Sequence, residues 1–293
     1  QFFLSPSFPL RRCSGGSWAR RCVYETALGR GLPNLGNTCY INSILQCLRY
    51  SKNLVYALKA HDSSGDSELV KSLMELFYAN APRHYLNVFV RELSKTPEFK
   101  LMRQCDAHEL FLYLTDSLFT QLKQYKNPYM GNLESTIICS QCNAKSITTY
   151  PFASLSVQMP MVPCTVDELL TAFCKEETLT DKIMCESCKV KQPCSKTLSV
   201  QPAHLLAIHL KRFTGIKKLY TEIIIQEHIK VNNVKYNLYA LCNHSGNSFG
   251  GHYTATCMKR DGTWIMLNDN HVGNLSSLPR KSDRPYILFY YKV

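Results

Sequence analysis

Several features that mark special classes of protein are missing from this sequence of 293 residues. No run of apolar residues approaches the roughly 18 that a transmembrane helix needs, so we expect no membrane-spanning segment. Internal repeats and low-complexity tracts are absent, and a content of 45% hydrophobic and 19% charged residues excludes a disordered or fibrous chain. Acidic residues are few, 22 against 34 Lys and Arg, which gives a net charge of +12. Because no Lys/Arg run is long enough for a nucleic-acid-binding arm, we expect neither a nucleic acid nor a membrane as a partner.

Cysteine, by contrast, is abundant, with 14 residues. In a small secreted protein this number would indicate disulfides, but the apolar segment 2–10 is followed by basic residues instead of preceded by them, and it makes a poor signal peptide. Since the sequence begins with Gln1, we expect a fragment or a processed product. Four of the cysteines form two C-x-x-C pairs, which indicates metal or redox chemistry in a reducing compartment. We therefore expect an intracellular protein that is cytoplasmic, nuclear or both.

The first half of the chain consists of a short tail and a helical region. Residues 1–30 are rich in Ser, Gly, Pro and Arg and show no clear period, so we expect a poorly ordered linker or tail. From about 31 to 130 apolar residues recur at helical spacing, which predicts helices at about 39–48, 69–77 and 107–118.

After residue 131 the pattern changes to short, partly alternating segments separated by turn-forming residues, which is typical of strands. One helix interrupts them, because Thr165 and Glu168 have the spacing of a capping box in front of an apolar run. A helical part followed by a strand-rich part indicates the α+β class, with catalytic groups at the seam. Strands are predicted over residues 135–139, 145–159, 204–213, 220–226, 236–243, 252–258 and 286–291.

The loop that leads into the first predicted helix carries a candidate nucleophile. Cys39 falls in the first turn of this helix, where unpaired backbone N–H groups and the helix dipole favour an anionic thiolate. Asn34, five residues earlier, has a side-chain amide that can donate to a developing oxyanion. The alternative is a buried structural cysteine after a flexible turn.

A nucleophilic cysteine needs a base, and His252 is the best placed of the nine histidines. It follows Gly250 and Gly251, which permit close approach of another backbone, and it opens a predicted strand. A hairpin would bring the end of the next strand, with Asn268 and Asp269, back beside it. Either residue can accept the Nδ1–H bond that fixes the useful tautomer of the ring. The alternatives are a strand histidine with a satisfied hydrogen bond and, for the Asn-Asp pair, ordinary turn chemistry.

The two C-x-x-C pairs predict a metal site. Cys139 and Cys142 form one pair and Cys185 and Cys188 the other, and two such pairs make a tetrahedral thiolate site for zinc. Because Cys39 does not belong to this set, we expect one structural Zn²⁺ per chain and no catalytic metal. The alternative is a set of unliganded thiols or a disulfide.

Together these motifs resemble those of the catalytic domain of the ubiquitin-specific proteases, in the right order over about residues 31–293. The subgroup with a compact, insertion-free catalytic domain is the most similar. The segments that carry the resemblance are GLPNLGNTCY at 31–40, QCDAHE at 104–109, HLKRF at 209–213, YNLYALCNHSG at 236–246, GGHY at 250–253, WIMLNDNHV at 264–272 and the two C-x-x-C pairs.

The resemblance implies a papain-like, hand-shaped fold. A helical thumb would span about 31–130, and a β-rich palm with zinc-tipped β fingers would span about 131–293. Cys39 would face His252 at the seam between thumb and palm.

By position in the motifs, Asn268 matches the third catalytic residue of the family and Asp269 an adjacent acidic residue that assists. Asn34 matches the residue that binds the oxyanion.

The implied activity is that of a cysteine-type ubiquitinyl hydrolase, which cleaves the isopeptide bond after the C-terminal glycine of ubiquitin on modified proteins. Its partners would be ubiquitin and ubiquitylated proteins, and the chain is expected to be a monomer. Three alternatives remain open: a catalytically weak homologue that only binds ubiquitin, a protease for a ubiquitin-like modifier, and a basic zinc-ribbon protein that binds nucleic acid.

Overall fold

The computed structural model describes residues 29–293 except 62–64, 79–81, 101 and 124. The predicted tail at 1–30 therefore lies outside the described residues, apart from Gly29 and Arg30. Within the described part of the chain, no helix has both the length and the apolar character that a membrane crossing requires.

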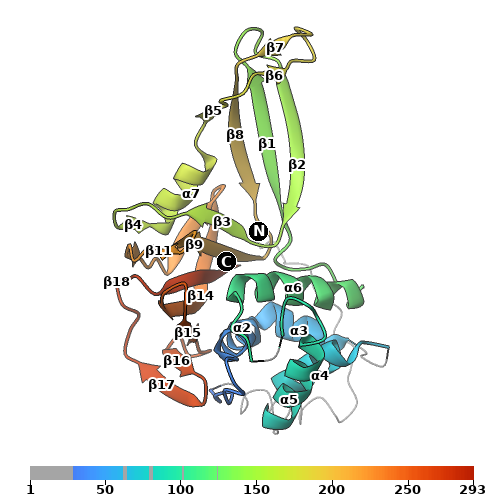
Figure 1. Cartoon of the computed structure of the whole chain (residues 1–293), viewed down its shortest axis with the longest axis vertical. Helices are drawn as coiled ribbons and strands as arrows, with labels where there is room; N and C mark the ends of the chain where they lie inside the picture. The colour runs from blue at the N-terminus through green and yellow to red at the C-terminus, as the bar shows by residue number, and fades with distance from the viewer. Residues whose placement is uncertain (1–28, 62–64, 79–81, 101, 124) are drawn as a thin grey trace, which may run out of the picture.

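The helices of the first half gather in one body beside the strands (Figure 1). The predicted helices at 39–48, 69–77 and 107–118 are confirmed. Every residue of α2 is buried, because it lies between the other helices and strand β15 of the large sheet. The bounds are α2 Cys39–Arg49, α3 Lys52–Ala60, α4 Glu68–Tyr78, α5 Pro82–Leu93 and α6 Ala107–Gln121.

Side chains cap the N-termini of α6 and of α7, Val166–Cys174. The Asp106 carboxylate caps α6 by accepting from the backbone N–H of His108 at 2.6 Å. In α7 the predicted capping box is complete, since the Thr165 hydroxyl accepts from the Glu168 backbone N–H and the Glu168 carboxylate accepts from that of Thr165.

The palm is an eight-stranded sheet in the order β17-β16-β15-β14-β19-β9-β3, with β13 also paired to β14. Neighbours run antiparallel except for β3 and β9. Strand β9 shows the alternation that buries both faces, since Ala207 joins the core shared with the thumb and Ile208 joins a second core beneath α7. The bounds are β3 Leu155–Gln158, β9 Leu205–Lys211, β13 His228–Val231, β14 Val234–Gly246, β15 Gly251–Met258, β16 Trp264–Asn268, β17 His271–Leu275 and β19 Pro285–Lys292.

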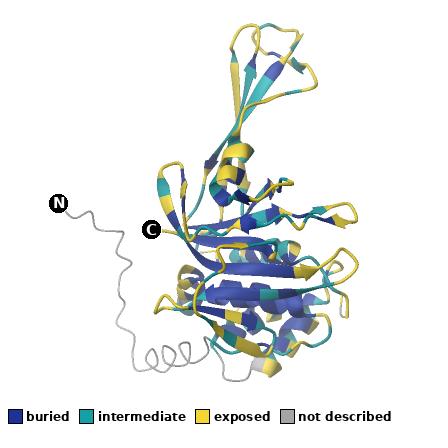
Figure 2. Ribbon diagram, turned by 90° about the vertical axis from the view of Figure 1, so that its left-hand side faces the viewer, coloured by how far each residue is buried: buried dark blue, intermediate teal, exposed yellow. Residues whose placement is uncertain are grey.

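A second sheet, in the order β2-β1-β8-β5, projects away from both bodies, with the β6–β7 hairpin at its tip (Figure 1). Most of this projection is exposed or half-buried, whereas the palm strands are buried (Figure 2). The bounds are β1 Gly131–Cys139, β2 Lys145–Phe152, β5 Glu177–Thr178, β6 Ile183–Met184, β7 Lys191–Gln192 and β8 Cys194–Gln201. Short strands complete the molecule: β4 Cys164–Thr165, β10 Phe213–Thr214, β11 Lys217–Lys218, β12 Ile223–Ile224 and β18 Lys281–Ser282.

Two predicted strands differ from the structure. The single strand predicted over 145–159 is wrong, because the chain leaves the fingers after Phe152 and enters the palm at Leu155. Of the strand predicted over 220–226, only Ile223 and Ile224 form a ladder. The α+β class is confirmed, and helices, palm and fingers have the predicted hand-like arrangement (Figure 1).

Candidate active site and metal centre

The loop before α2 is wound around the side chain of Asn34. Its Oδ1 atom accepts hydrogen bonds from the backbone N–H of Gly36 at 3.0 Å and of Thr38 at 3.2 Å. The Thr38 hydroxyl in turn accepts from the backbone N–H of Leu35 at 2.9 Å. These bonds place Cys39 in the first turn of α2, where the residue is only 2% exposed.

The hairpin of β15 and β16 brings His252 and Asn268 together. Their pairing register places the end of β16 beside the beginning of β15, and Nε2 of His252 lies 2.6 Å from Oδ1 of Asn268. Because an amide oxygen only accepts, Nε2 carries the proton in this contact. The prediction that Nδ1 would be the bonded nitrogen is therefore wrong, and Nδ1 is left as the basic nitrogen of the neutral ring.

Within the described part of the chain, Asp269 has no hydrogen bond to His252 and instead ties the β16–β17 turn to the loop before α2. Its Oδ2 accepts from Nδ2 of Asn34 at 2.9 Å, its Oδ1 accepts from Nδ2 of Asn42 at 2.7 Å, and its carbonyl oxygen accepts from the Leu32 N–H at 2.9 Å. The approach is so close that a Cβ on Gly31 would lie 2.4 Å from the Asp269 carbonyl oxygen. Asp269 thus fixes the orientation of Asn34 and leaves one N–H of the Asn34 amide for another acceptor.

Gln104 is a residue of this site to which sequence reasoning gave no role. Its Nε2 atom donates to Cys39 Sγ at 3.2 Å and to the Gly251 carbonyl oxygen at 2.6 Å, and its Oε1 accepts from the Gly251 N–H at 3.2 Å. No hydrogen bond joins Cys39 to His252 in the part of the chain that the structure describes. The motif at 104–109 was the only signal for Gln104, because its partners lie 65 and 147 residues away in sequence.

The four paired cysteines meet at the tip of the fingers. The Sγ atoms of Cys139, Cys142, Cys185 and Cys188 all lie within 4.8 Å of one another, and all four are free thiols. The disulfide alternative is therefore not seen, and the cluster can hold a metal ion.

The two loops that present these cysteines have the same backbone form. Each has a residue in the left-handed region four positions after its first cysteine, Asn143 at φ 57° and Lys189 at φ 58°. The closing hydrogen bonds are Asn143 N to Cys139 O (2.9 Å) and Cys139 N to Ala144 O (3.0 Å) in the first loop, and Lys189 N to Cys185 O (2.8 Å) and Cys185 N to Val190 O (3.1 Å) in the second.

Backbone N–H groups in the first loop also favour the anionic form of a thiol. Those of Cys142 and Gln141 lower the pKa of Cys139 to about 7. Metals bind cysteine as the thiolate, so this loop is suited to a cation at neutral pH.

Comparison with known proteins places the chain in a family. Residues 30–290 match the family model described as "UCH: Ubiquitin carboxyl-terminal hydrolase". The chain belongs to the ubiquitin carboxyl-terminal hydrolase family. It is 30% identical over 323 residues to "Ubiquitin carboxyl-terminal hydrolase Usp2" of Drosophila melanogaster, with 89% of this chain and 34% of the relative covered. It is also 30% identical over 331 residues to "Ubiquitin carboxyl-terminal hydrolase 2" of Homo sapiens, with 89% of this chain and 54% of the relative covered. The chain thus spans about a third to a half of the length of these relatives.

A solved structure supports the same fold. The SAGA Ubp8/Sgf11/Sus1/Sgf73 DUB module bound to ubiquitin aldehyde contains a chain that superposes with a TM-score of 0.83 at 23% identity. The match covers 92% of this chain and 70% of that one. The hand-like fold expected for this family member is therefore confirmed.

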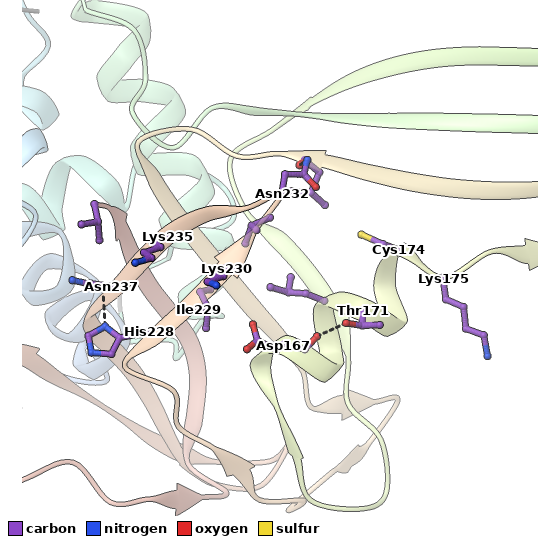
Figure 3. A pocket seen from close by; sticks show the side chains of 14 residues that line it. Asp167, Thr171, Cys174, Lys175, His228, Ile229, Lys230, Asn232, Lys235 and Asn237 are labelled. Atoms are coloured by element: carbon purple, nitrogen blue, oxygen red, sulfur yellow. Dashed lines mark hydrogen bonds between the residues drawn. The ribbon is translucent and has the colours of Figure 1, made fainter. Parts of the chain in front are cut away.

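A pocket of about 1150 Å³ lies apart from the candidate catalytic residues of this hydrolase-family chain. It is lined by residues of α7, β8 and the β13–β14 hairpin, among them the apolar Leu170 and Ile229. Lys175, Lys230 and Lys235 also line it (Figure 3). Neither Cys39 nor His252 lines it.

Proposed function

We propose that residues 31–293 form the catalytic domain of a thiol-dependent deubiquitinase. The observation that carries the proposal is the junction of four segments at the seam of thumb and palm. Cys39 lies at the start of α2, and α2 packs directly on β15, the strand that holds His252. Asn268 holds His252, and Asp269 holds Asn34 beside the loop of Cys39.

The residues divide the reaction between them. Nδ1 of His252 takes the proton of the Cys39 thiol, and the resulting thiolate attacks the carbonyl carbon of the terminal glycine of ubiquitin to form a thioester. His252 passes this proton to the departing lysine amine. His252 uses Nδ1 for this proton, because Nε2 is bonded to Asn268. His252 then takes a proton from the water that hydrolyses the thioester and returns it to the sulfur of Cys39 as the C–S bond breaks.

The negative charge that develops on the substrate carbonyl oxygen must be stabilised by hydrogen-bond donors. The backbone N–H of Cys39 belongs to the first turn of α2, where no intrahelical acceptor exists. The remaining N–H of Asn34 supplies a second donor, oriented by Asp269. Two such donors fixed before the reaction stabilise an oxyanion without reorganisation.

Zinc is the metal we assign to the cysteine cluster. Four thiolates around one tetrahedral zinc would lie roughly 3.8 Å apart, given Zn–S bonds of about 2.3 Å. The 3.6 Å separation of Cys142 Sγ and Cys185 Sγ fits this arrangement. One structural zinc would join the two loops at the tip, where few apolar side chains are buried.

The partners we propose are ubiquitin and ubiquitylated proteins, with the chain acting as a monomer inside the cell, in the cytoplasm, the nucleus or both. The DUB module in the structural comparison is bound to ubiquitin aldehyde, which supports the choice of ubiquitin. Residues 1–30 are proposed as a linker or tail outside the catalytic domain.

Hydrolysis of C-terminal rhodamine conjugates tests this function. We expect the zinc-loaded chain to release rhodamine from ubiquitin and to lose this activity in the His252→Ala variant. Faster release from a ubiquitin-like modifier would reassign the substrate. Absence of turnover in a folded, zinc-loaded chain that binds ubiquitin would favour the weak homologue and overturn the proposal.

A further inference from the structure

Gln104 joins the two halves of the candidate active site. It lies between α5 and α6 of the thumb, yet its side chain bonds to the first residue of β15 in the palm and to the sulfur of Cys39. No other side chain in the described part of the chain has a hydrogen bond to Cys39 Sγ. The inference below rests on the proposed function, since it takes Cys39 as the nucleophile.

The hydrogen bonds of Gln104 fix the orientation of its amide. Nε2 has two N–H groups, and one donates to the Gly251 carbonyl oxygen while the other donates to Cys39 Sγ. Oε1 accepts from the Gly251 N–H, so the amide pairs with both backbone groups of this residue. A flipped amide would place its oxygen against the Gly251 carbonyl oxygen, which leaves both acceptors without a donor.

Gly251 is held from its other side as well. A Cβ at this position would lie 2.1 Å from Nε2 of His244, so a side chain cannot be placed there without a shift. The backbone of Gly251 is therefore enclosed between Gln104 and His244. Because His252 is the next residue, Gln104 fixes the position of the base relative to the nucleophile.

We propose that Gln104 is a catalytic residue: it stabilises the thiolate of Cys39 by hydrogen-bond donation and holds the strand that carries His252. A donor within hydrogen-bond distance of sulfur stabilises the anion more than the neutral thiol, because hydrogen bonds to charged groups are the stronger ones. His252 makes no hydrogen bond to the sulfur in this structure, so Gln104 is the side chain that supplies this stabilisation.

Alkylation of Cys39 by iodoacetamide tests the proposal without any ubiquitin substrate. The rate is followed by peptide mass spectrometry at pH 6 and pH 9 in the wild type, Gln104→Met and Gln104→Glu. We expect Gln104→Met to slow the reaction about tenfold at pH 6, from the loss of one hydrogen bond to a charged group, and to slow it less at pH 9. Gln104→Glu should slow it further at pH 6, because a carboxylate beside the sulfur opposes the thiolate.

Gln121→Met is the matched control. Gln121 is also half-buried and also pairs with backbone groups, through the Ser67 N–H and the Ser117 carbonyl oxygen, but it lies at the far end of α6. We expect wild-type alkylation in this variant. Equal rates in wild type and both Gln104 variants at pH 6, or an equal loss in the control, would overturn the proposal.

Turnover of ubiquitin-rhodamine gives a second readout. We expect kcat to fall at least tenfold in Gln104→Met while KM stays within about threefold, because the lost interaction acts on the nucleophile and not on ubiquitin. A rise in KM with unchanged kcat would contradict a catalytic role and mean that Gln104 only holds the two segments together. If the chain has no activity on ubiquitin at all, the alkylation result still decides the role of Gln104, so the two proposals fail separately.

Discussion

The tip of the fingers and the seam between thumb and palm are both built around cysteine, but they are assembled in opposite ways. At the tip, two loops of six residues with the same backbone form bring four cysteines together. At the seam, single residues arrive from segments as far apart as Asn34 and Asp269, which are separated by 235 positions. Each half of the first site is encoded within one short loop, whereas the second site is assembled from single residues of distant segments.

The two regions also differ in what surrounds them. The buried cluster at the tip contains only Cys139, Cys185 and Cys194, and strand β2 is exposed along most of its length. The seam lies on the large core that joins the thumb helices to the palm. We therefore expect a lost cysteine to damage structure at the tip and chemistry at the seam.

The largest effect should come from Cys39→Ala. Removing the nucleophile should lower turnover of ubiquitin-rhodamine by at least ~10³-fold, because the remaining groups cannot form a thioester. Ubiquitin affinity, measured by calorimetry, and zinc content should both remain at wild-type levels, because neither depends on the thiol. Substantial turnover by the purified variant would contradict the assignment.

Cys185→Ser should affect zinc content and folding in the first place, and not the chemistry at Cys39. Loss of one thiolate should remove the zinc and loosen the fingers, because structural zinc contributes directly to the free energy of folding. Elemental analysis should find about one zinc per chain in the wild type and much less in the variant. Limited proteolysis should cut the variant within residues 139–194.

Cys174→Ser is the control for that experiment, since this half-buried cysteine lies outside the cluster. It should keep its zinc, and both variants should keep the wild-type alkylation rate at Cys39. A folded, fully active wild-type chain without zinc would refute the structural role of the metal.

The contrast between the regions explains how far the sequence could predict them. The cysteine loops could be predicted because their spacing is short, and α2 and the β15–β16 hairpin because each depends on local periodicity. The seam could be predicted only as a set of candidates. Gln104 could not be assigned a role, since its partners lie 65 and 147 residues away. The choice between Asn268 and Asp269 also depends on the turn, where Asp269 adopts φ 49° and directs its carboxylate to Asn34 and Asn42.

Asn268 and Asp269 bond to different residues, so we expect the losses in transition-state stabilisation from the two substitutions to add. Asn268→Ala should lower kcat/KM about 10- to 100-fold, less than the 10²–10⁴-fold that general acid–base catalysis supplies, because a neutral amide orients the imidazole without strongly stabilising its cation. Asp269→Ala should cost about tenfold through the orientation of Asn34. A double-mutant cycle checks this, and a double loss well beyond the product would mean that each residue substitutes for the other.

The smallest effect concerns the pH dependence of stability in the palm. His209 stacks on His108 with ring centroids 3.9 Å apart, and burial lowers the pKa of His209 to about 3. The unfolded chain binds a proton at about pH 6.5 and the folded chain does not, so stability is retained above pH 6.5 and falls as the pH drops toward 3. The loss should be on the order of 1 kcal/mol per pH unit.

Urea unfolding of wild type and His209→Gln at pH 7.5 and 5.5 measures the loss of stability that is due to His209. The variant should lose less stability over the interval, because it removes the titrating ring, whereas acid release of the proposed zinc would affect both proteins alike. An equal loss in the two proteins would show that His209 does not contribute.

The central claim, that Cys39 at the seam attacks the carbonyl at the end of ubiquitin, is tested most directly by a covalent probe. Ubiquitin with a C-terminal propargylamide should form one adduct per chain, mapped by peptide mass spectrometry to Cys39 and absent in Cys39→Ala. The four cysteines at the tip should stay unlabelled. An adduct on any other of the 14 cysteines, or none on the folded, zinc-bound chain, would contradict the account.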